Sequence, residues 1–121
     1  MKTRTVILAV FLAALALPAV AADIFGEWLR DNGASHVKFA RCGEFICGTV
    51  VWLRDSDSPA KIGEKVFFDM KATGPDTWEG QAFNPEDGKT YSGKMTLDGD
   101  TLTTAGCVLA ILCKTATWTR L

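Results

Sequence analysis

From residue 23 onward, apolar and polar residues alternate in short runs, without the three-to-four-residue spacing of an amphipathic helix. Glycine, asparagine, aspartate and proline separate these runs, as in the turns between antiparallel strands. The pattern predicts eight strands, at residues 25–30, 35–42, 46–54, 65–71, 77–84, 89–97, 101–107 and 113–121. Because most connections are short, consecutive strands should pair antiparallel as a meander.

The register of the hairpin at residues 35–54 is predicted from the side chains that must share a face. Placing Cys42 opposite Cys47 pairs Phe39 with Val50 and gathers apolar side chains on one side of the sheet. A half-buried antiparallel sheet needs this segregation.

The hairpin at residues 89–107 passes the same test. Asp98-Gly99-Asp100 is a tight turn, and placing Leu97 opposite Leu102 leaves the polar residues on the other face. Both hairpins therefore have a consistent inside and outside.

Eight antiparallel strands in sequence order can close on themselves, which removes the exposed edges of the sheet. Closure places the first strand beside the last, where Trp28 and Arg120 can form a cation–π pair worth about 0.5–2 kcal/mol. Gly26 would allow a close approach at this seam. The simpler alternative is that Arg120 is a solvated charge and Trp28 an ordinary core residue. We predict an all-β protein, a small eight-stranded antiparallel up-and-down barrel.

Residues 1–22 have the features of a secretory signal peptide. Lys2 and Arg4 precede an apolar run over residues 6–17, which is shorter than the ~20 residues that span a bilayer, and small residues follow Pro18. Cleavage would leave a single barrel domain over residues 23–121, with no membrane span. We expect export across the inner membrane, to the periplasm.

Charge narrows the classes of partner. The chain has 13 Lys and Arg residues against 14 Asp and Glu residues, and loss of Lys2 and Arg4 would leave 11 against 14, a net charge of −3. A protein without a positive field is poorly suited to nucleic acid or to anionic lipid.

The four cysteines all follow the predicted signal peptide. An even number in a small secreted chain indicates two disulfides, for which three pairings are possible. Spacing favours Cys42–Cys47 and Cys107–Cys113, because each pair brackets a short candidate hairpin loop.

Several motifs occur in an order that resembles the bacterial secreted family called "domain of unknown function 2147". They are Gly26-Glu27-Trp28, Cys42-Gly43-x-x-x-Cys47-Gly48, Val50-Val51-Trp52-Leu53, Trp78-x-Gly80, Asn84-Pro85-x-Asp87-Gly88-Lys89-Thr90-Tyr91, Leu102-x-x-x-Gly106-Cys107 and Trp118-Thr119-Arg120. The Gly-x-Trp start and the late arginine are also similar, more loosely, to the signature of lipocalin-like barrels (calycins). The connector at residues 54–64 is shorter than in the first family. The resemblance implies a fold and a compartment, and no activity.

Candidate catalytic and metal motifs are weak. His36 is the only imidazole, no Gly-x-Ser-x-Gly elbow is present, and Gly88-Lys89-Thr90 lacks the earlier glycine and the helix of a phosphate loop. The acidic pairs at residues 55/57 and 98/100 are ordinary turn chemistry and lack the further ligands of a calcium loop. We therefore expect no enzymatic activity, no cofactor and no metal.

Two features remain as candidate binding elements. Five side chains are expected to form the walls of a ligand pocket in the barrel: Phe39, Trp52, Trp78, Tyr91 and Met95. The same side chains could instead be plain core, since an eight-stranded barrel is only just wide enough for a small ligand. The other element is an apolar loop, Val108, Leu109, Ala110, Ile111 and Leu112, at a hairpin tip that is usually polar. We expect it to fold inward as a plug; the alternative is an exposed ligand portal or docking surface.

The leading hypothesis is a secreted, non-catalytic barrel that binds a small apolar or amphipathic ligand. The alternative is an interaction module with a filled core, such as a periplasmic enzyme inhibitor, that contacts its partner through the loop at residues 108–112.

Overall fold

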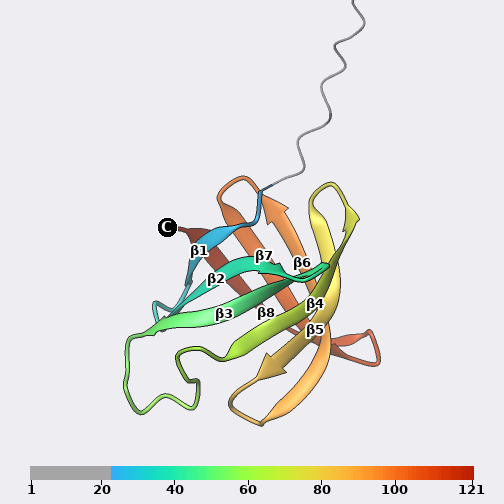
Figure 1. The fold of residues 1–121 in the computed structure, drawn as a ribbon. Helices are drawn as coiled ribbons and strands as arrows, with labels where there is room; N and C mark the ends of the chain where they lie inside the picture. The colour runs from blue at the N-terminus through green and yellow to red at the C-terminus, as the bar shows by residue number, and fades with distance from the viewer. Residues whose placement is uncertain (1–22) are drawn as a thin grey trace, which may run out of the picture.

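The computed structural model describes residues 23–121, in which eight antiparallel strands follow one another around a closed barrel (Figure 1). The strands are β1 (Gly26–Arg30), β2 (Ser35–Cys42), β3 (Phe45–Leu53), β4 (Lys65–Gly74), β5 (Thr77–Asn84), β6 (Lys89–Asp98), β7 (Thr101–Val108) and β8 (Leu112–Arg120). The predicted eight-stranded up-and-down barrel is therefore confirmed. The segment predicted to be a signal peptide, residues 1–22, lies outside the described residues.

The seam between β1 and β8 closes the barrel. Trp28 pairs with Arg120 across it, and the Arg120 guanidinium carbon lies 4.4 Å from the centroid of the Trp28 ring. Arg120 Nε also donates a hydrogen bond to Asp100 Oδ1 at 2.9 Å, and its Nη2 donates one to the carbonyl of Asp23 at 3.0 Å. The expected cation–π pair is thus present, on a fully buried indole.

Gly26 is the first residue of β1. The reason for a glycine at this position is not the predicted close approach. A Cβ atom at this position would meet no heavy atom within 4 Å, but the glycine has a φ of +112°. Residues with a side chain rarely adopt that backbone conformation, so Gly26 is explained by its conformational freedom rather than by space.

The two hairpins whose register was predicted behave differently. Leu97 lies opposite Leu102 in β6 and β7, as predicted. In β2 and β3 the predicted register is wrong, because Cys42 lies opposite Phe45 and Phe39 opposite Gly48. The chain turns already at Gly43, whose φ is +67°, and the two bridged cysteines are diagonal rather than direct neighbours.

Gly48 shows why this register is preferred. A Cβ atom there would lie 2.7 Å from the Phe39 ring and 3.0 Å from the Phe67 ring. The glycine therefore leaves the space in which two stacked aromatic rings, 5.6 Å apart, fill the barrel.

Two β-bulges redirect side chains. In β3 the register shifts by one residue opposite the His36–Val37 step, so Val51 is the extra residue and Trp52 shares the outer face with His36. In β4 the register shifts between Phe68 and Lys71, and Asp69 adopts a φ of +54°. Bulges of this kind bend strands and increase their twist, as closure of a small barrel requires.

Packing divides the interior into two halves. The half near Ile24, the end of β8 and the β2–β3, β4–β5 and β6–β7 turns is here called the closed end. It is filled by buried side chains: Ile24, Trp28, Phe39, Met70, Trp78, Met95, Leu97 and Leu102. The β1–β2, β3–β4, β5–β6 and β7–β8 loops surround the opposite end, here called the open end (Figure 1). Any ligand site within the barrel must therefore lie toward the open end.

Candidate ligand-binding cavity

A cavity of about 770 Å³ occupies the open end of the barrel. Its inner wall is apolar and comes from inward-facing positions of five strands: Val37, Val50, Val66, Phe67, Ala82, Ala116 and Trp118. The volume falls within the ~300–1,000 Å³ typical of small-molecule sites. The barrel is thus filled at one end and hollow at the other.

Aromatic rings form the boundary between the two halves. Phe67 stacks on buried Phe39 and meets Trp118 edge to face, with centroids 6.1 Å apart. Trp118 Nε1 donates a hydrogen bond to Thr104 Oγ1 at 3.0 Å. Because this donor is already satisfied, the ring presents an apolar surface to the cavity.

Arg30 brings a positive charge to the apolar cavity. It lies opposite Trp118 across the seam, two residues beyond inward-facing Trp28, and its guanidinium carbon is 5.6 Å from the centroid of the Trp118 ring. The buried Nε atom lies 3.5 Å from Asp31 Oδ1 in an ion pair, but it has no hydrogen-bond partner among the described residues. Arg30 therefore places a charged guanidinium group beside the apolar wall.

Tyr91 and Asp87 form a polar pair at the rim. The Tyr91 hydroxyl donates a hydrogen bond to Asp87 Oδ2. This bond lowers the pKa of Asp87 below its ordinary value and raises the pKa of Tyr91. The turn that carries Asp87 is fixed by Asn84, whose Oδ1 accepts a hydrogen bond from the Glu86 amide, and by Gly88, whose φ is +68°.

The apolar loop of residues 108–112 lies at the same end. Leu109 and Ile111 are 81% and 79% exposed, so the prediction that this loop plugs the barrel is wrong. Val108 and Leu112 are also exposed, but they line the cavity mouth. The Cys107–Cys113 disulfide joins the two strands at the base of the loop, with a Cα–Cα distance of 4.0 Å.

The five residues predicted as pocket walls lie in three different parts of the protein. Phe39, Trp78 and Met95 are buried in the filled half and do not line the cavity, so the alternative of plain core holds for these three. Trp52 is 40% exposed outside the barrel, because the bulge at Val51 turns it outward. Of the five residues predicted to form the wall, only Tyr91 lines the cavity, so the predicted wall is corrected.

Sequence reasoning missed the residues that do form the wall. Val37 faces the cavity from a position between polar His36 and Lys38, which is the available signal, whereas Phe67 stands between two apolar residues and carries no such signal. Alternation separates inside from outside, but it carries no information about which end of the barrel is left empty.

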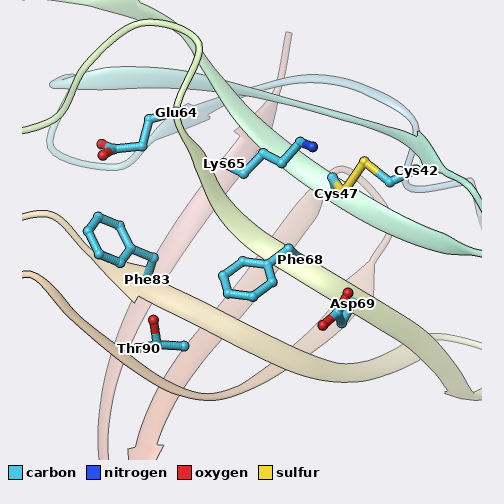
Figure 2. Close-up of a pocket in the computed structure, with 8 residues that line it drawn as sticks. All are labelled: Cys42, Cys47, Glu64, Lys65, Phe68, Asp69, Phe83 and Thr90. Carbon is cyan, nitrogen blue, oxygen red and sulfur yellow. A yellow bond between two sulfur atoms is a disulfide. The ribbon is translucent and has the colours of Figure 1, made fainter.

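A second hollow, of about 500 Å³, lies on the outside of the barrel (Figure 2). Figure 2 shows the Phe68 side chain between Phe83 and Asp69, with Lys65 nearby and the Cys42–Cys47 disulfide at one edge. Its two sulfur atoms are bonded to each other, so neither can act as a thiolate nucleophile. We regard this hollow as a surface groove rather than a reaction site.

His36 does not contribute to the cavity. It stacks on Trp52 outside the barrel, with ring centroids 4.4 Å apart, and its Nδ1 lies 3.9 Å from Glu27 Oε1. Within residues 23–121, no three histidine, cysteine, aspartate or glutamate side chains gather as a metal site would need. That same range contains no helix that is long and apolar enough to cross a membrane.

The closed eight-stranded barrel has a lipocalin-like fold. A solved structure, described as protein HP1028 from the human pathogen Helicobacter pylori and as belonging to the lipocalin family, has a TM-score of 0.65 to this chain. The two share 19% sequence identity, and the alignment covers 82% of this chain and 83% of that chain. This likeness shows the fold alone.

The chain belongs to the family described as "Uncharacterized protein conserved in bacteria (DUF2147)", whose sequence profile matches residues 26–120. The resemblance identified from the ordered motifs is therefore confirmed. No curated protein matches the chain.

Proposed function

We propose that this protein is a non-catalytic binding protein of the bacterial periplasm, which takes a small apolar or amphipathic ligand into the open end of the barrel. The observation that carries the proposal is the cavity of about 770 Å³ with its wall of valine, alanine and aromatic side chains. An apolar wall with few polar groups is the usual composition of a small-molecule site.

The polar groups of the cavity suggest an amphipathic ligand. Arg30 brings a positive charge beside Trp118, and Tyr91 of β6 with Asp87 of the β5–β6 turn forms a polar pair that lines the same cavity. A molecule with an apolar body and a polar end would satisfy both kinds of surface.

The alternative of an interaction module with a filled core is less well supported, because only the closed end is packed. Enzymatic activity is also disfavoured. The single histidine lies outside the barrel, and the four cysteines are in disulfides, so the cavity has neither an imidazole nor a thiol to activate a reaction.

The periplasmic location is supported by chemistry. Two disulfides form within residues 23–121, and such bonds persist in oxidising compartments and are rare in the cytosol. The predicted signal peptide points to the same compartment.

Titration with the neutral apolar fluorophore N-phenyl-1-naphthylamine tests the proposal. Gly106 lines the cavity, and a Cβ atom there would meet nothing closer than 3.5 Å. Gly106→Leu should therefore fill the cavity without straining the backbone, and weaken probe binding by about tenfold or more.

The matched control is Thr103→Leu, which adds the same side chain to an exposed position of β7. It should leave probe affinity unchanged. Circular dichroism would verify that both variants are folded. Absence of saturable binding to the unmodified protein, or an equal loss in both variants, would refute the proposed function.

A further inference from the structure

The loop between β7 and β8 presents an exposed apolar surface that extends beyond the ligand cavity. We call Val108, Leu109, Ala110, Ile111 and Leu112 the apolar tip. All five residues are exposed, and the loop stands out from the barrel between the ends of β7 and β8 (Figure 1). A contiguous exposed apolar patch marks an interaction site more often than scattered apolar residues do.

The backbone holds this tip in a fixed shape. Leu109 and Ala110 have φ angles of +56° and +63°, in the left-handed region that glycine and asparagine usually occupy in hairpins. The disulfide at Cys107–Cys113 joins the strands directly below. Leu109 and Ala110 thus occupy turn positions where glycine or asparagine would fit the backbone better.

The size of the tip argues for a lipid bilayer rather than a protein as its partner. A stable protein interface buries about 800 Å² on each side and uses 20–30 residues. Five residues at one hairpin tip fall well short of this size. A projecting segment with a few apolar side chains is, by contrast, enough to enter the boundary between lipid headgroups and acyl chains.

The position of the tip gives the second argument. Val108 and Leu112 belong both to the tip and to the lining of the cavity, so an apolar path runs from the exposed tip into the barrel. A bilayer accepts such a tip and also contains apolar and amphipathic molecules that could follow this path.

The charged residues at the cavity mouth do not favour anionic lipid over zwitterionic lipid. Lys114 lines the cavity next to the tip, but Glu86 and Asp87 line it as well. The two signs are mixed, so the attraction must come from apolar side chains, and a zwitterionic bilayer suffices.

We propose that the apolar tip inserts into the interfacial region of a lipid bilayer and brings the mouth of the cavity to the membrane surface. This inference goes beyond the proposed function and is separable from it. Leu109 and Ile111 do not line the cavity, so changing them alters the tip without altering the ligand site.

Flotation with phosphatidylcholine vesicles tests the inference. The unmodified protein should float with the vesicles, and Leu109→Ser combined with Ile111→Ser should lower the partition coefficient by about a hundredfold, roughly tenfold for each lost side chain. The matched control is Leu121→Ser, a 60% exposed leucine at the closed end, which should leave flotation unchanged.

Three results would overturn the inference: no flotation of the unmodified protein, flotation that the double variant retains, or an equal loss in the control. A dimer that the double variant converts to monomer, without flotation, would also overturn it by identifying a second copy of this chain as the partner. Binding of N-phenyl-1-naphthylamine should be kept by the double variant. Failure of the unmodified protein to bind this probe would refute the proposed function alone.

Discussion

Replacing Arg120 with methionine should weaken the closure between β1 and β8 while keeping an unbranched side chain over Trp28. The change removes a cation–π contact at 4.4 Å, worth about 0.5–2 kcal/mol. It also removes the hydrogen bond from Nη2 to the Asp23 carbonyl at 3.0 Å. The ion pair with Asp100 adds little, since that carboxylate is 80% exposed and such pairs contribute about 0–1 kcal/mol.

These contributions suggest that Arg120→Met lowers the free energy of unfolding by about 2 kcal/mol. In a domain of this size, 1 kcal/mol shifts the melting temperature by about 4–8 °C, so a decrease of about 10 °C is expected. Most of the loss should persist at about 1 M salt, because screening weakens the exposed ion pair but leaves the contact with buried Trp28.

Urea unfolding followed by tryptophan fluorescence measures the effect. Arg41→Met is the matched control, because Arg41 is an exposed arginine near the end of β2. It should change the free energy of unfolding by less than about 0.5 kcal/mol. If Arg120→Met costs no more than Arg41→Met, the seam contact does not hold the barrel closed and the reasoning fails.

Three further changes test other parts of the account. Gly80→Ala would place a Cβ atom 2.5 Å from a backbone carbonyl of β4 and should destabilise the protein by about 1–3 kcal/mol in urea unfolding; an unchanged midpoint would contradict the tight contact. Replacing Cys107 and Cys113 together with alanine should lower the free energy of unfolding by about 2 kcal/mol, measured in the same way, and no loss would show that the bridge is dispensable. Tyr91→Phe should raise the pKa of Asp87 toward its ordinary value of 3.8 in an NMR titration, because the hydroxyl no longer stabilises the carboxylate; an unchanged value would contradict the hydrogen bond. Since this bond lowers the folded-state pKa of Asp87, its stabilisation should be present above pH 3.8 and lost as pH falls through that folded-state pKa.

The barrel could be predicted because several independent features of the sequence agree. Period-two alternation, short turns and complementary residues at the two ends of the chain all indicated the same topology, and Leu97 opposite Leu102 followed from hydrophobic pairing alone. The β2–β3 register failed because direct opposition of Cys42 and Cys47 was assumed. A disulfide also joins diagonal neighbours, and the turn at Gly43 decides between the two arrangements.

The site could be predicted only in part. Phe39, Trp78 and Met95 were correctly expected to face inward, but their depth along the barrel axis depends on strand stagger, which alternation does not encode. Trp52 was misplaced because no sequence feature marks Val51 as a bulge. The apolar tip was misjudged for a further reason: the preference of apolar residues for burial is general, whereas the outward path of this turn depends on backbone angles at Leu109 and Ala110.

Contact quenching by a brominated fatty alcohol can show whether a ligand enters the open end of the barrel, because bromine quenches a tryptophan that it touches. Of the four tryptophans, Trp118 alone lines the cavity, Trp28 and Trp78 are buried at the closed end, and Trp52 lies outside. The account predicts saturable quenching that is lost in Trp118→Phe and kept in Trp52→Phe. Quenching that survives in Trp118→Phe and disappears in Trp52→Phe would place the ligand on the outer surface and contradict a binding cavity inside the barrel.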